Sequence, residues 1–199
     1  MPTDLHVSRL DSVLRVLSIA GARTVLDLGC GTGELILRLL GDDQILKIQG
    51  VDLSATALDE ARRRIEKERG AAADRAVLRH GSCVAPDPSF LGFDAVVLVE
   101  TIEHIPPNHL SRLESTVFRY CRPRIVVVTT PNSDYNALYG VPDNRLRHRE
   151  HHFEWGRRRF MAWAEGIGRR NGYSVETGGV GGVHIRYGAP SQIATFSRS

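Results

Sequence analysis

Short apolar runs alternate with amphipathic stretches along this chain, and the alternation constrains the fold more than any other feature. The run FDAVVLVE is apolar along nearly its whole length, as expected of a strand buried on both faces of a parallel sheet. Apolar residues at helical spacing follow or precede such runs, for example over 7–20 and 55–69. The pattern predicts an α/β fold with a doubly wound, mostly parallel seven-stranded sheet and helices on both faces.

The strands of this sheet are placed by the same pattern. Further helices are predicted over 108–120 and 157–171, and a short one ends at Gly41. The predicted strands lie in the segments TVLDLGCGTG, ILKIQGVDLS, AVLRHGSC, FDAVVLVE and RIVVVTTPN, with a closing hairpin-like pair in YSVETGGVGG and PSQIATFSR. The polar segment 131–156 is predicted to be a long loop, which in a compact domain is usually functional or disordered.

Composition sets the broad class of the protein. The length suits one domain, and we predict a single domain over residues 1–199. A net charge of +3 permits an RNA or phosphate partner without requiring one. The three dispersed cysteines argue against a disulfide framework or a cysteine zinc site. No signal peptide and no membrane-length apolar stretch is present, so we expect a soluble, cytoplasmic protein with no membrane partner.

A glycine-rich loop follows the first predicted strand. Gly29, Gly31 and Gly33 in VLDLGCGTG let the backbone turn sharply and approach a ligand closely. Asp27 lies at the end of the first strand, and Asp52 ends the second about 20 residues further on, where dinucleotide folds place an acid that holds ribose hydroxyls. The alternative is a glycine turn without a ligand, which the strand–loop–helix context disfavours.

The pattern D-x-G-C-G-x-G resembles motif I of the class I S-adenosylmethionine-dependent methyltransferases, which have a Rossmann-like fold. A dinucleotide enzyme would show G-x-G-x-x-G, which this loop lacks. The resemblance implies S-adenosylmethionine as cofactor, with Asp27 and the glycines at its methionine end and Asp52, followed by Leu53, at its ribose. It also implies that Ser82 and Cys83 lie near the adenine, although Cys83 is equally explained as a small buried apolar residue.

The segment LVETIEHIPP turns abruptly from apolar to charged. Glu100, Glu103 and His104 follow the fourth predicted strand, at the sheet edge where α/β proteins bind ligands. Two carboxylates and an imidazole suit Mg²⁺ or Mn²⁺. A fourth ligand is available from the histidines of RLRHREHHFEW, which are His148, His151 and His152. The alternatives are helix capping for the acids and a solvated surface for the histidines.

Other polar residues near this segment are candidate substrate contacts. Arg147 and Arg149 belong to a set of arginines that can hold phosphates, although a solvated basic face is about as probable for any one of them. Asn132 lines a substrate pocket or forms a turn. Phe153 and Trp155 stack on a base or, as is more common, belong to the core. The full arginine set is Arg145, Arg147, Arg149, Arg157, Arg158 and Arg159.

The pair of motifs E-x-x-E-H and [DE]-H-x-F-E-W resembles the HEN-type small-RNA 3′-terminal 2′-O-methyltransferases, over nearly the whole chain. The resemblance implies methyl transfer to the 2′-hydroxyl at an RNA 3′ end, with Mn²⁺ or Mg²⁺ held by Glu100, Glu103, His104 and His151. Glu150 stands where Asp is common in the family. Bacterial members act in RNA repair beside a kinase–phosphatase–ligase partner and usually carry an extra N-terminal domain.

Two other functions compete with this interpretation. A metal-assisted small-molecule O-methyltransferase on the same fold would also use a divalent ion to hold paired hydroxyls. A binding module without activity would keep the fold but not need the ligand set. The arginine-rich segment argues against the first, and the intact Asp27 and glycine loop argue against the second.

Overall fold

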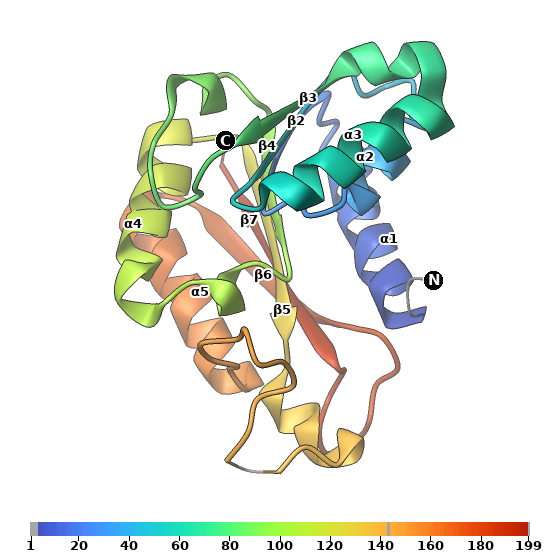
Figure 1. The fold of residues 1–199 in the computed structure, drawn as a ribbon. Helices are drawn as coiled ribbons and strands as arrows, with labels where there is room; N and C mark the ends of the chain where they lie inside the picture. Colours follow the sequence, from blue (N-terminus) through green and yellow to red (C-terminus); the bar gives the residue numbers. More distant parts are fainter. Residues whose placement is uncertain (1–3, 143, 199) are drawn as a thin grey trace.

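The computed structural model describes residues 4–142 and 144–198, and its centre is one seven-stranded sheet (Figure 1). The strand order is β3-β2-β1-β4-β5-β7-β6, and only the β5–β7 and β6–β7 pairs are antiparallel. The predicted fold class is therefore confirmed. The strands are β1 Thr24–Leu28, β2 Lys47–Asp52, β3 Ala76–His80, β4 Ala95–Val99, β5 Ile125–Pro131, β6 Ser174–Val180 and β7 Ser191–Ser197.

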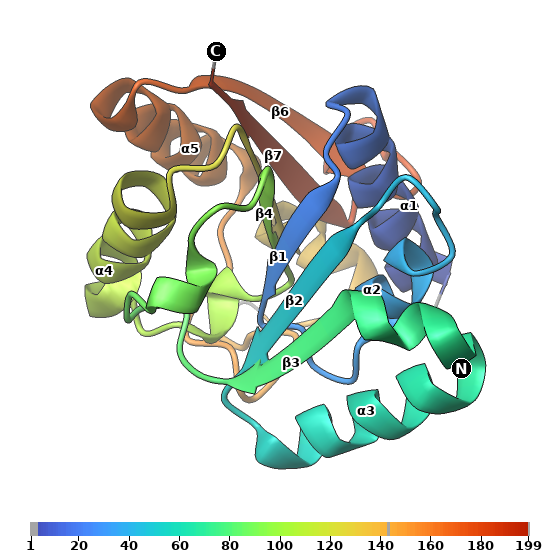
Figure 2. The same cartoon turned by 90° about the horizontal axis from the view of Figure 1, so that it is seen from above.

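Helices cover both faces of the sheet. Seen from above, α1, α2 and α3 lie on one side and α4 and α5 on the other (Figure 2). These helices are α1 Asp4–Ile19, α2 Glu34–Leu39, α3 Ala55–Arg69, α4 Leu110–Glu114 and α5 Arg157–Asn171. In the part of the chain that the structure describes, no helix is both long enough and apolar enough to span a bilayer.

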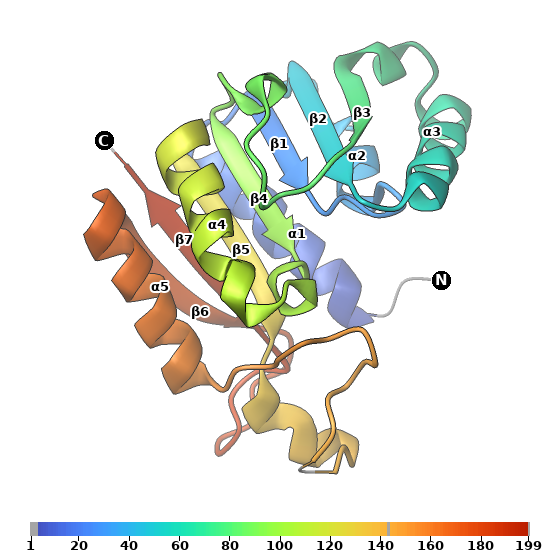
Figure 3. The ribbon, with the colours of Figure 1, turned by 60° about the vertical axis from the view of Figure 1, so that its left-hand side comes forward.

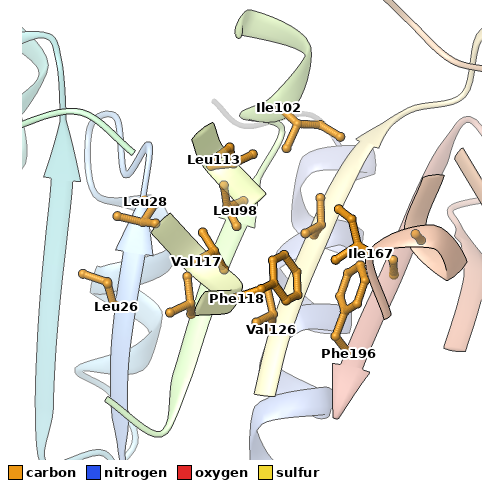
Figure 4. Packing of buried hydrophobic residues seen from close by; sticks show 14 of the residues in the cluster. Leu26, Leu28, Leu98, Ile102, Leu113, Val117, Phe118, Val126, Ile167 and Phe196 are labelled. Carbon is orange, nitrogen blue, oxygen red and sulfur yellow. The ribbon is translucent and has the colours of Figure 1, made fainter. Parts of the chain in front are cut away.

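The side chains of β4 explain why its sequence is apolar without alternation. Val96 and Leu98 pack in the core on the side of α4 and α5, whereas Ala95 and Val97 pack in the core under α1 and α2. Each face of the strand is thus buried by a different helical layer. Figure 4 shows the first of these cores, where Phe118 and Ile167 from the helices pack over Leu98 and the neighbouring strands.

The helix predicted over 108–120 differs from expectation. A short 3₁₀ turn precedes α4, and α4 continues into the π-helix Ser115–Cys121. The wider π turn buries three consecutive residues, Thr116, Val117 and Phe118, which a regular α-helix would spread around its circumference. The sequence pattern shows where the apolar face lies but not this change in winding.

The carboxyl ends of the parallel strands define the functional edge of the molecule. β1, β2, β3 and β4 run side by side in the same direction (Figure 3). The segment after β5, predicted to be a loop, contains the 3₁₀ helix Ser133–Tyr139 and a bridge between Asn132 and Trp155. In Figure 1 this segment and the β6–β7 connection both lie at the lower end of the sheet.

We predict that Phe196→Ala lowers the free energy of unfolding by about 3–5 kcal/mol, because the ring is fully buried between the helices and the sheet. Chemical denaturation measures the loss. Ile185→Ala is the control, because the Ile185 side chain is 100% exposed and its removal should change stability by less than about 0.5 kcal/mol. Equal losses in the two variants would contradict the assigned core.

Candidate active site

The glycine loop lies at the edge where β1, β2 and β3 end together. Gly29 has φ 84° and Gly31 has φ 51°, values that strain most residues with a Cβ. A Cβ added to Gly29 would meet the Thr101 side chain at 2.5 Å. Glycine is therefore required at position 29 both by its backbone conformation and by the residue packed against it.

Asp27 provides a buried acidic group beneath this loop. Its side chain is 2% exposed, and among the described residues its Oδ1 has no hydrogen-bond partner. Burial raises the pKa of Asp27 to about 7, and the nearby charge of Asp52 adds to the effect. A cationic group of a ligand placed here would supply the missing partner and stabilise the carboxylate.

Asp52 faces the glycine loop and also binds its backbone. Its Oδ2 accepts a hydrogen bond from the Gly31 N–H at 2.8 Å, and its Oδ1 accepts one from the Ser54 N–H at 2.8 Å. Sequence analysis assigned Asp52 to ribose binding and did not anticipate these backbone contacts. They fix the carboxylate at the open edge of the sheet.

The remaining predicted cofactor residues lie at the same edge. Leu53 is largely exposed after β2, while Ser82 and Cys83 are half-buried in the loop that follows β3. Burial raises the pKa of the Cys83 thiol to about 11, so it remains protonated at neutral pH. The predicted set is therefore spread along three adjacent strand ends, as a nucleoside-sized ligand requires.

Glu103 is the most unusual residue of the charged corner. It lies in the 3₁₀ turn Ile102–His104 and is 0% exposed. Its Oε2 accepts a hydrogen bond from the Thr130 hydroxyl at 2.8 Å, whereas its Oε1 has no partner among the described residues. Burial, together with the charge of Glu100, raises the pKa of Glu103 well above its ordinary value. An unpartnered buried carboxylate oxygen of this kind needs a cation or a proton.

Two histidines complete a potential metal centre with Glu103. One ligand atom each from Glu103, His104 and His151 lies within 4.8 Å of the others. The rings of His104 and His151 are in edge contact at 4.8 Å between centroids. Burial lowers the pKa of His104, and His151 lowers it further, so this imidazole is held in the neutral form that binds metals.

Glu154 orients the His151 ring, a role that sequence analysis missed. The His151 Nδ1 lies 2.6 Å from Glu154 Oε1. Burial alone would raise the pKa of Glu154, but hydrogen bonds from His151, Asn136 and the Arg147 backbone hold it below its ordinary value. A carboxylate is a usual partner for the ring nitrogen of a metal-binding histidine that does not bind the ion. With Glu154 on Nδ1, the Nε2 of His151 is left for an ion. The position of Glu154 three residues after His151 was the available signal.

Glu100 does not join the other three predicted ligands. It adopts φ 51°, and its carboxylate forms an ion pair with Arg9 at 3.0 Å and accepts a hydrogen bond from the Ser191 hydroxyl at 3.0 Å. The acids were alternatively considered as helix caps, but neither caps the turn that follows. Nothing in the sequence indicated that Arg9, 91 residues from Glu100, would be its partner.

The cofactor edge and the charged corner are in direct contact. Thr101 stands between Glu100 and Glu103 in the chain, and its hydroxyl donates to the Leu28 carbonyl at 3.2 Å. The same side chain packs against Gly29. A ligand held by the glycine loop therefore lies beside the potential metal centre.

The predicted substrate residues have different environments. The Asn132 amide is buried and donates to the carbonyls of Tyr187 and Ala189, while its Oδ1 accepts from the Asp134 N–H, so Asn132 forms a turn. The Arg147 guanidinium donates to Asn136, to the Pro190 carbonyl and to the Asn132 carbonyl, and it braces this segment. Arg149 is exposed.

Of the two interpretations of the neighbouring aromatic residues, the structure supports core packing. Trp155 is buried and Phe153 packs on the same cluster, with their rings stacked at 4.3 Å. The His148 ring lies 5.5 Å from that of His151 and 6.1 Å from that of His104, outside the three-ligand group. His152 donates its backbone N–H to the Glu103 carbonyl, while its side chain is exposed.

Comparison with known proteins agrees with this geometry. A family model described as a methyltransferase domain matches residues 25–124. The methyltransferase domain of the bacterial protein CtHen1-C superposes with a TM-score of 0.89 at 38% identity, covering 98% of each chain. The chain belongs to the HEN-type methyltransferase domains. The structure of a small RNA methyltransferase, HEN1, gives a TM-score of 0.91 at 32% identity over 98% of this chain and 26% of that one.

Curated relatives extend beyond the region that this HEN-type domain matches. The mouse protein named small RNA 2′-O-methyltransferase is 34% identical over 98% of this chain. The match spans 51% of the mouse protein, so this chain corresponds to about half of its length.

We predict that Glu103→Gln stabilises the ligand-free protein by about 1–3 kcal/mol at pH 8, because it removes a buried charge and keeps an acceptor for Thr130. Since the folded-state pKa of Glu103 is raised, its contribution to stability is present at low pH and is lost as pH rises through that pKa. The gain should therefore vanish near pH 4. Denaturation of both proteins across pH measures it, and a variant destabilised at pH 8 would contradict the assignment.

Proposed function

We propose that this domain transfers a methyl group from S-adenosylmethionine to the 2′-hydroxyl of the 3′-terminal nucleotide of RNA, with Mn²⁺ or Mg²⁺ at the charged corner. The observation that carries the proposal is the convergence of Glu103, His104 and His151 beside the glycine loop. The fold and the HEN-type relatives support methyl transfer as the reaction class.

The residues present fit a divalent ion. One buried carboxylate oxygen without a partner and two imidazoles form a mixed oxygen and nitrogen set, without the thiolates typical of structural zinc. Glu100 is proposed as the fourth ligand, as the family resemblance implies. Its carboxylate would have to share or release Arg9, so we expect it to contribute less to ion binding than Glu103 does.

At the cofactor edge, the proposed role of Asp27 is to hold the α-ammonium group of S-adenosylmethionine. The ammonium would give the unpartnered Oδ1 its hydrogen bond and favour the ionised carboxylate. Asp52 holds the ribose hydroxyls while its backbone contacts keep the loop open. Ser82 and Cys83, with Leu53, border the adenine in this proposal.

At the acceptor edge, an ion bound to these residues would supply the positive charge that lowers the pKa of a ribose 2′-hydroxyl toward neutral pH. Glu103, His104 and His151 position that hydroxyl beside the methyl donor, with Glu154 holding the His151 ring. His148 lies outside the three-ligand group, and its Nδ1 accepts a hydrogen bond from the Glu150 N–H at 3.3 Å. A terminal ribose offers a 2′,3′-diol, which neither DNA nor an internal nucleotide has, and this accounts for recognition of the RNA end.

RNA is the proposed partner on the exposed side of the site. Arg149 and the arginines at the start of α5 are exposed and can contact phosphates without sequence preference. By the resemblance to bacterial HEN-type proteins, a kinase–phosphatase–ligase repair protein is a proposed second partner.

We predict that Glu154→Gln weakens Mn²⁺ binding by about 10–100-fold, because the His151 ring loses its carboxylate partner. Glu103→Gln should weaken it more, and Glu100→Gln less than Glu103→Gln. Isothermal titration with Mn²⁺ measures all three. Glu165→Gln, an exposed change on α5, is the control. The ligand assignment fails if Glu103→Gln binds Mn²⁺ as tightly as the wild type.

We predict methylation only of RNA that carries a free 2′,3′-diol. The assay follows transfer from labelled S-adenosylmethionine, with and without Mn²⁺, to RNAs ending in a diol, a 2′-deoxyribose or a 3′-phosphate. The methylated product should resist periodate oxidation, since the diol is gone. Equal methylation of the 3′-phosphate RNA would contradict the diol mechanism, and preference for a simple catechol over RNA would favour a small-molecule enzyme.

A further inference from the structure

A second cavity lies beside the candidate active site, between the first turn of α5 and the edge strand β6. Its volume is about 720 Å³, enough for a nucleoside. Gly178 and Gly179 of β6 line one wall, Arg159 and Phe160 line another, and Gln192 of β7 belongs to the lining. None of the residues assigned above to the cofactor or to the ion lines the cavity. Asn132, a candidate substrate contact, does line it, and its side chain forms a turn.

One row of the sheet connects the cavity lining with the charged corner. Thr130 pairs with Gln192, and Gln192 pairs with Gly179, so these residues lie in line across β5, β7 and β6. Thr130 is the residue that donates to Glu103. Two strand spacings separate the ends of this row, about 10 Å. Ser191, which donates to Glu100, also lines the cavity.

Gln192 carries an unsatisfied acceptor in the cavity lining. Its side chain is 3% exposed, and its Nε2 donates to the Pro131 and Trp155 carbonyls at 3.0 Å and 2.7 Å. Its Oε1 has no partner among the described residues. Because the amide nitrogen is fixed by two carbonyls, the oxygen is a preset acceptor for an N–H group such as the exocyclic amine of a base.

The rim of the cavity suits a phosphate. Arg158 and Arg159 are exposed, and the Arg159 guanidinium lies over the Trp155 ring at 5.2 Å. The first N–H of α5 is already bound by the Asp134 carboxylate, which accepts from the Arg157 N–H at 3.2 Å, so the two exposed arginines are the rim groups left for a phosphate. An apolar chamber with one buried acceptor and a cationic rim matches the parts of a nucleotide.

We propose that this cavity is a subsite for the base of one of the last two nucleotides of the RNA. The inference rests on the proposed function and extends it, because it assigns a place to the chain next to the methylated ribose. The apolar lining and the Gln192 acceptor hold the base, while the arginines of the rim hold the adjoining phosphate.

The chain offers a matched pair of variants for the test. Thr177 of β6 is exposed, lines the cavity and pairs with Ala194 on the same sheet face as Gln192, so the large side chain of Thr177→Trp fits the strand and projects into the cavity. Gly182→Val is the control, because a Cβ there meets nothing within 4 Å and Gly182 does not line the cavity. Thermal unfolding and S-adenosylmethionine binding verify that both variants keep the fold.

The substrates are RNAs with a single abasic nucleotide at the last, second-last, third-last or a distant internal position. For the wild type and Gly182→Val, we expect kcat/KM to fall about 10-fold or more when the abasic site is at one of the last two positions. For Thr177→Trp, intact RNA should already show most of that loss, and the abasic site should add less than about 3-fold.

Two results would overturn the subsite. One is a wild-type kcat/KM that is the same for every abasic RNA, which needs no variant and leaves the proposed function intact. The other is an undiminished abasic penalty in Thr177→Trp. Failure of the wild type to methylate any RNA in the presence of Mn²⁺ would instead refute the proposed function, and the subsite with it.

Discussion

The complete burial of the Glu103 carboxylate is the constraint on which the rest of the site depends. A buried carboxylate with one neutral hydrogen bond is costly, and here the nearby Glu100 increases the cost. The fold places two imidazoles close to the free oxygen of Glu103 and reduces the repulsion from Glu100 by pairing Glu100 with Arg9. On the proposed function, a bound cation offsets this cost, as expected of a site selected for binding rather than for stability.

Thr101 connects the glycine loop with the charged corner. Thr101 sits in the chain between the two glutamates and fills the space that a Cβ on Gly29 would occupy. The glycine loop and the charged corner cannot shift independently, because the Thr101 hydroxyl also donates to the strand that begins the loop. Methyl transfer requires precise placement of the methyl group and the hydroxyl that receives it. On the proposed function, this contact fixes the distance between them.

The features that could be predicted from the sequence are those that depend on local pattern. The strand–helix alternation and the glycine loop follow from spacing. The ligand set Glu100, Glu103, His104 and His151 came from the family resemblance, and the structure brings the last three of these together. What sequence analysis missed depends on the fold bringing distant residues together. The partner of Glu100 comes from α1, and the π-helix arises from packing on the sheet. Arg147 carried no sign that its guanidinium is used by internal carbonyls. Glu154 differs from these, because the motif itself contains it, but its role follows only from its distance to His151.

Anomalous X-ray scattering from crystals grown with Mn²⁺ and S-adenosylhomocysteine tests the central claim most directly. The account predicts one strong manganese peak within about 2.0–2.3 Å of Glu103 Oε1, His104 and His151, beside the glycine loop. The peak should disappear in crystals of Glu103→Gln. A manganese peak elsewhere on the chain, or none at this corner under saturating Mn²⁺, would contradict the account.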